Sequence, residues 1–342
     1  MNELIFPISA VLMVFLVIIP GLTLISRWYL ARKRAKIKSW ANFGSESTFA
    51  WIVAPTLLPI TWFISSAFHQ TESTQSQASC LIDHAQVTTC DDALFLVGFL
   101  LIGMVLSVAL RTWREKPNIN LHYVGEDSPY FERVSRILEN AKPDYKMKIK
   151  IVQDSPEPMF TIGWFRPSIV LDACFLQSAD DEMILAALLH ESAHITGFDT
   201  FRGFIGRLCL SINPVGFLLQ NDFQHWQSAR EVQCDSVAVS KGGQALALAE
   251  SIVSAARLSR LGVFAAHECR LPGAAHLCGP DAAILKLRLA ILFDGPAKPL
   301  RTFGQIILGL GLATLLLLPH LQSIGLLEHF HFEVEAFFHT YL

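Results

Sequence analysis

The sequence has 342 residues, of which 52% are hydrophobic and only 17% are charged. This composition excludes an ordinary soluble domain, and the length is sufficient for several membrane helices together with one globular unit. The formal net charge is −3, and no basic patch interleaved with aromatic residues is present. The sequence therefore predicts no nucleic-acid partner.

Four apolar segments are each long enough to cross the hydrocarbon core of a bilayer, which takes about 20 residues. Almost no charge interrupts them, which disfavours the alternative that they are core helices of a soluble protein. We predict an α-helical multi-pass membrane protein with an α+β domain inserted between the third and fourth crossings, at 117–300. The predicted crossings are 4–25, 49–68, 93–110 and 303–321.

The basic residues predict the orientation, because cytoplasmic loops carry an excess of lysine and arginine. Six of them follow the first crossing between Arg27 and Lys38, whereas the loop 69–92 has none and carries four acidic residues. Both chain ends are thus expected outside, and 111–301 in the cytoplasm, at a bacterial inner membrane. The first segment lacks the basic start of a cleavable signal peptide and is expected to remain as an anchor.

The cysteines fit this topology. Cys80 and Cys90 both fall in the external loop, where a disulfide can form, although two unrelated thiols are the alternative. The other five are expected to be reduced. Four residues of one later stretch are chemically able to bind a metal, but their spacing matches no zinc motif, so a loop with reduced cysteines is preferred. They are His267, Cys269, His276 and Cys278.

The predicted cytoplasmic domain, 117–300, reads as a small sheet followed by helices. A linker leads into a helix within 117–140, and alternation of lysine and apolar residues predicts a strand. A hairpin and a strongly apolar helix follow. The stretch 205–219 is hydrophobic, but its arginine, asparagine and proline argue against another crossing. The remaining expected elements are a strand at 146–153, strands at 159–162 and 168–171, and helices at 183–195, 224–240 and 244–261.

The apolar helix carries an H-E-x-x-H motif, from His190 through Glu191 to His194. Residues four apart share one helix face, so both imidazoles can reach a single Zn²⁺ while Glu191 faces the reacting water. A solvated polar helix face is the alternative. It is disfavoured because the surrounding residues are almost all apolar, which predicts that the three side chains are buried and need partners.

A catalytic zinc site needs a third protein ligand. In the extended pattern H-E-x-x-H-x-x-G-x-x-H, Gly197 falls at the glycine, but Thr200 stands where the last histidine belongs. A downstream E-x-x-x-D instead offers Glu231 as the ligand, with Asp235 on the same face to accept the outer N–H of a ligating histidine. An ordinary charged helix face is the alternative reading of this pair.

These motifs and their order resemble the BlaR/MecR type of membrane gluzincin. The resemblance covers about 90–300 and rests on the H-E-x-x-H helix with Asp199, the E-x-x-x-D helix, the stretch 162–171 and Asn213-Pro214. It implies a zincin-like fold with a small sheet beside the active-site helix and cleavage of cytoplasmic proteins such as repressors. The β-lactam receptors of this type carry a penicillin-binding sensor domain after the last membrane helix, and with about twenty residues after the last predicted crossing antibiotic sensing is not expected here.

The sequence thus predicts a membrane zinc endopeptidase that cleaves a cytoplasmic protein, with Glu191 as the base and the strand 159–162 aligning the substrate. An HtpX-like quality-control protease is one alternative, although the 37-residue step from His194 to Glu231 leaves little room for the membrane helices found there in that type. A non-catalytic metal-containing receptor is another. The oxyanion donor is not identified, with His225 and Arg230 as candidates, and the oligomeric state is left open, a homodimer included.

Overall fold

The fold is taken from a computed structural model of the chain. It describes 11–36, 40–69, 102–103, 105–108, 110, 122–125, 127–141, 148–153, 155, 157–164, 166–260, 274–276 and 282–294. The expected fourth crossing, most of the third, and Cys80, Cys90, His267, Cys269 and Cys278 lie outside these residues.

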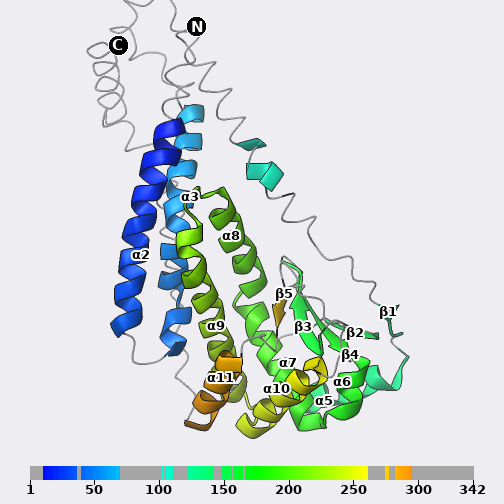
Figure 1. Ribbon diagram of the computed structural model, residues 1–342. Coiled ribbons are helices and arrows are strands. Elements are labelled where there is room, and N and C mark those ends of the chain that lie inside the picture. The colour runs from blue at the N-terminus through cyan, green and yellow to red at the C-terminus, as the bar shows by residue number, and fades with distance from the viewer. Residues whose placement is uncertain are drawn as a thin grey trace, which may run out of the picture.

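The chain begins with a helical hairpin (Figure 1). A helix at Val11–Lys36 comprises a π-helical stretch, η2 (Val14–Ile18), and α2 (Ile19–Lys36); a 3₁₀ turn, η3 (Trp40–Gly44), leads into α3 (Glu46–His69). Within the described part of the chain, Val11–Lys36 is the one helix identified as long and apolar enough to cross a membrane. It continues through the basic residues beyond the expected end at 25, since lysine and arginine favour helices and reach water with long side chains.

A small five-stranded sheet lies at the opposite end of the molecule (Figure 1). Its order is β1-β2-β4-β3-β5, in which β2 and β4 are parallel and the other pairs antiparallel. The expected hairpin of β3 and β4 is confirmed, and it turns at Gly163, whose φ of 105° suits glycine. The strands are β1 (His122–Tyr123), β2 (Ile149–Gln153), β3 (Met159–Ile162), β4 (Ser168–Asp172) and β5 (Ala274–His276).

The helices of the second half surround α7, which the sequence predicted at 183–195. Asp180 caps its first turn by accepting the N–H of Met183 at 2.8 Å, and its residues are almost all buried between the sheet, α9 and α10. The helices are α5 (Pro129–Ala141), α6 (Ala173–Ser178), α7 (Asp181–Thr196), α8 (Asp199–Ile212), α9 (Phe217–Ser240), α10 (Ala245–Arg260) and α11 (Ala282–Asp294).

The apolar stretch 205–219 is divided between two helices. Helix α8 ends at Ile212 because Asn213 precedes a proline, which disfavours helical backbone at Asn213. The side chain of Asn213 then accepts the N–H of Val215 at 3.0 Å and forms the turn into α9. Helix α9 therefore begins at Phe217, seven residues before the expected start at 224.

The hairpin and the helices α8 and α9 share one core. Leu30 of α2, Phe43 of η3 and Ile52 of α3 are fully buried against α9, where Trp226 is 2% exposed. Polar contacts support this packing: Asn213 donates to the buried hydroxyl of Thr23 at 2.9 Å, and Arg34 pairs with Asp222. The hairpin is therefore part of the body of the protein.

The interface is tightly packed at Gly44, where an added Cβ would lie 2.9 Å from the carbonyl carbon of Ala229. We predict that Gly44→Ala separates η3 from α9 and destabilises the protein by about 1–3 kcal/mol. Gly21→Ala is the control, because nothing lies within 4 Å of a Cβ there. Thermal unfolding in detergent compares the two, and equal melting temperatures for Gly44→Ala and wild type would contradict the predicted close packing.

Candidate metal centre

Three potential ligand atoms meet between α7 and α9. The Nε2 atoms of His190 and His194 lie 3.2 Å apart, and the two carboxylate oxygens of Glu231 each lie 3.5 Å from one of these nitrogens. One turn of α7 separates the two histidines, and α9 runs alongside to bring in Glu231. The structure thus brings together the three residues that the sequence proposed as ligands.

Their spacing fits a small divalent cation. Zinc binds nitrogen and oxygen at about 2.0–2.2 Å, so the ligands of a tetrahedral site are separated by about 3.3–3.5 Å. The separations of 3.2 and 3.5 Å agree with this value, and 3.5 Å is too long for a strong hydrogen bond. Oε2 of Glu231 is buried without a hydrogen-bond partner among the described residues. A cation between the three side chains would satisfy these atoms.

An aspartate stands at the other ring nitrogen of each histidine. Nδ1 of His194 is hydrogen-bonded to Oδ2 of Asp199 at 2.9 Å. Nδ1 of His190 lies 2.8 Å from Oδ1 of Asp235, the residue proposed for this position from the sequence, in an ion-pair contact that is not an aligned hydrogen bond. An acceptor at Nδ1 stabilises the tautomer that leaves Nε2 free for a metal. The two Nε2 atoms are therefore presented to the same point.

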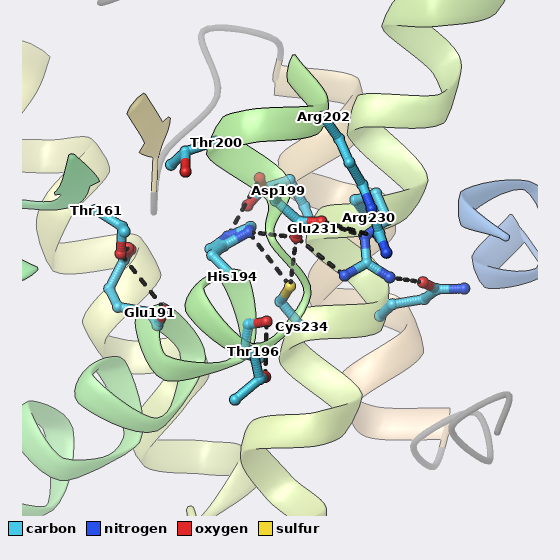
Figure 2. A network of polar contacts seen from close by, with 12 residues as sticks. Thr161, Glu191, His194, Thr196, Asp199, Thr200, Arg202, Arg230, Glu231 and Cys234 are labelled. Carbon is cyan, nitrogen blue, oxygen red and sulfur yellow. Dashed lines mark hydrogen bonds and ion pairs between the residues drawn. The ribbon is translucent and has the colours of Figure 1, made fainter. Parts of the chain in front are cut away.

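Each aspartate is in turn bound by an arginine. Arg230 donates to both oxygens of Asp199 at 3.0 Å, and Arg288 donates to both oxygens of Asp235 at 2.8 and 2.7 Å. Figure 2 shows the network around Asp199, where the thiol of Cys234 also lies 3.4 Å from Nδ1 of His194. Charge-assisted pairs of this kind fix orientation because both hydrogen bonds must form together.

Glu191 and Thr161 lie beside His194, on the side away from Cys234 (Figure 2). Glu191 is fully buried, and its Oε2 accepts a hydrogen bond from the hydroxyl of Thr161 at 2.6 Å. Its Oε1 has no hydrogen-bond partner among the described residues. Burial raises the pKa of Glu191 above its ordinary value. Thr161 thus fixes one oxygen of the Glu191 carboxylate, and the other oxygen can accept a further hydrogen bond.

The electrostatics of the centre favour positive charge between the ligands. Burial lowers the pKa of His190, but Asp235 and Glu231 raise it by more than burial lowers it. The pKa of His190 therefore lies above its ordinary value. Burial raises the pKa of Glu231, but the two histidines have the larger opposite effect. The pKa of Glu231 therefore lies well below its ordinary value. The carboxylates therefore stabilise a cation at the point where the histidine nitrogens meet, which a divalent metal ion can supply.

This geometry accompanies a match to a known family. The family model described as BlaR1 peptidase M56 matches residues 11–267, about three quarters of the chain. The chain belongs to the BlaR1 peptidase M56 family. No match is found among curated proteins. The family is one of metallopeptidases, and the apolar helix at the start of this member agrees with its association with a membrane.

The structure gives the contacts of three further residues of this M56 peptidase that the sequence analysis singled out. Thr200 donates to the carbonyl of Gly163 at 2.7 Å and braces the β3–β4 turn. Of the two oxyanion candidates, Arg230 is bound to Asp199, and the ring of His225 packs on Trp40 with centroids 5.4 Å apart. These contacts do not select between the two candidates, and the oxyanion donor stays unassigned.

The edge of β3 that was expected to pair with substrate is occupied by another strand. We predicted that this strand aligns the substrate, but β5 pairs with it, with Phe160 opposite His276. A strand edge beside the site is an efficient template for pairing, and here another segment of the same chain occupies it. The far side of β3 pairs with β4, so within the described residues both edges of β3 are occupied.

Sequence reasoning assigned no role to Asp199, Cys234 or Arg288. Asp199 was noted only as part of the family pattern. It follows His194 by five residues, a spacing that does not place two side chains on the same face of a helix. Arg288 had a signal that can be recognised: it stands on the same face of an apolar helix as Leu285 and Leu292, and an arginine at such a position needs a buried carboxylate.

Asp199→Asn tests the support of His194 in this M56 peptidase. The amide keeps the shape but loses the charge that holds both Nδ1 and Arg230, so we expect zinc affinity to fall about 10–100-fold. Competition with a chromogenic chelator measures it on the metal-free protein. Asp222→Asn is the control, because this buried carboxylate pairs with Arg34 and should leave affinity unchanged. An unchanged affinity in Asp199→Asn would show that His194 needs no such partner.

Proposed function

We propose that the protein is a membrane-embedded, zinc-dependent endopeptidase that cleaves a cytoplasmic protein, a regulator or repressor in a signalling response. The observation that carries the proposal is the spacing of 3.2–3.5 Å among His190, His194 and Glu231, with the buried carboxylate of Glu191 beside them. A purely structural metal site needs no such carboxylate, which disfavours the non-catalytic receptor.

The residues of the chain provide the acid–base chemistry. Zinc held by His190, His194 and Glu231 would polarise the scissile carbonyl and acidify water. Glu191 is the general base: Thr161 fixes its Oε2, and its Oε1 accepts the proton of the attacking water. The protonated carboxyl, which burial favours, then delivers the proton to the leaving amine.

The charge pattern supports a cellular location for the protein, and the length of α8 supports one of the two family arrangements. The basic residues between Arg27 and Lys38, at the turn of the hairpin, support a cytoplasmic location for the peptidase domain, in a bacterial inner membrane with both chain ends outside. Helix α8 joins the two zinc-binding helices and has 14 residues, about 21 Å, which is shorter than a hydrocarbon core of about 30 Å. This length supports a BlaR-like over an HtpX-like arrangement.

The test compares wild type with Glu191→Gln and Glu231→Gln. We expect purified wild type to hold one zinc, Glu191→Gln to keep zinc without activity, and Glu231→Gln to lose zinc. The readout for cleavage is the set of new protein N termini in the cytoplasm of cells producing each variant. A few termini specific to wild type support a regulatory peptidase, whereas many support quality control. Zinc-free wild type, or identical termini with Glu191→Gln, contradicts the proposal.

The contact between Thr161 and Glu191 gives a second test. Thr161→Val removes the 2.6 Å hydrogen bond with little change in volume, so Glu191 loses a fixed orientation. We expect kcat to fall about tenfold, since a hydrogen bond to a charged group contributes about 1.5–3 kcal/mol. Zinc content should stay at the wild-type level. Thr161→Ser retains the hydroxyl and should restore most of the rate, and a Thr161→Val enzyme with full activity would remove Thr161 from the mechanism.

A further inference from the structure

Helix α11 brings an arginine into the metal centre from beyond the family match, which ends at 267. One face of α11 is apolar and packs on the core around α7 and α10 through Leu285, Leu289 and Leu292. Arg288 lies on the same face and is 1% exposed. A guanidinium is expensive to bury, so its position requires compensation by specific partners.

Arg288 has two acidic partners at the centre. Its Nε and Nη2 donate to the two oxygens of Asp235 at 2.8 and 2.7 Å, and its Nη1 lies 3.4 Å from Oε2 of Glu231. The Oδ1 of Asp235 that accepts from Arg288 also faces Nδ1 of His190 at 2.8 Å. One guanidinium thus contacts both the proposed ligand Glu231 and the carboxylate that orients the ligand His190.

The planar fork of arginine suits this task. Two parallel N–H groups fix the plane of the Asp235 carboxylate, and the third nitrogen attracts Oε2 of Glu231. A lysine at this position has the charge but cannot hold both oxygens of Asp235 in a plane. The geometry of two of the three proposed ligands therefore depends on one side chain of α11.

We propose that Arg288 is a positioning residue of the metal centre, which orients His190 through Asp235 and Glu231 directly. This inference rests on the proposed zinc site. It makes α11 a component of the catalytic unit, in addition to the two helices that carry the ligands. Arg230 has the corresponding position behind His194, so both ligand histidines are supported by an aspartate–arginine pair.

The experiment measures zinc affinity of the metal-free full-length protein in detergent, by chelator competition, for Arg288→Gln and Arg288→Lys. We expect a fall of about 10–100-fold in Arg288→Gln and a smaller fall in Arg288→Lys. Arg133→Gln is the matched control: Arg133 pairs with Asp181 on α7 and donates to the carbonyls of Leu176 and Ala179, so its loss also costs stability. Its zinc affinity should remain that of wild type.

Cobalt substitution separates positioning from general stability. The visible absorption of Co²⁺ depends on the arrangement of its ligands, so we expect an altered spectrum in Arg288→Lys and an unchanged one in Arg133→Gln. If Arg288→Gln fails to fold, Arg288→Lys decides by both measurements. Wild-type affinity and spectrum in Arg288→Lys and wild-type affinity in any folded Arg288→Gln would overturn the inference. Wild type without zinc would instead overturn the proposed function.

Discussion

Three ionisable side chains stand in the C-terminal half of α7, a helix that is mostly apolar and almost entirely buried. His190, Glu191 and His194 are at most 1% exposed, and polar groups buried to this extent must find partners within the protein. Much of the surrounding structure supplies them. Asp199 and Asp235 face the outer ring nitrogens, Thr161 holds Glu191, and arginines hold the aspartates. The cost of burying these charges thus explains why the second half of the chain is built from so many separate elements.

The partners of the H-E-x-x-H helix come from distant parts of the sequence. Thr161 belongs to a strand before the helix, Asp199 to the helix after it, and Arg288 to a helix almost one hundred positions later. Such an arrangement ties the sheet, α8, α9 and α11 to a single point. A shift of one element relative to α7 therefore alters the orientation of a ligand or of the base, which makes the site sensitive to the packing of the whole domain.

Local patterns predicted the elements that carry the candidate ligands better than they predicted the contacts that support these ligands. The spacing of the two histidines on one helix face, the hairpin at Gly163 and the E-x-x-x-D of α9 are periodic or local signals, and the structure places these elements where they were expected. The pairing of β5 with β3 and the contact of Cys234 with His194 are long-range, and no local pattern encodes them. The apolar face of α11 indicates that Arg288 is buried, but it does not indicate that Asp235 is the partner. The start of α9 was missed because the break at Asn213-Pro214 lies within a continuous apolar run.

The packing of the N-terminal hairpin against α9 has a consequence for the independence of the peptidase domain. Gln233 donates to the carbonyl of Ala41 in η3 at 2.7 Å and also contacts Arg230, while Arg202 pairs with Glu46 of α3 at 2.7 Å. A truncated protein without its first 69 residues would expose Trp226 to solvent and leave Gln233 and Arg202 without these partners. The peptidase domain is accordingly not separable from the hairpin, because the hairpin covers one side of α9.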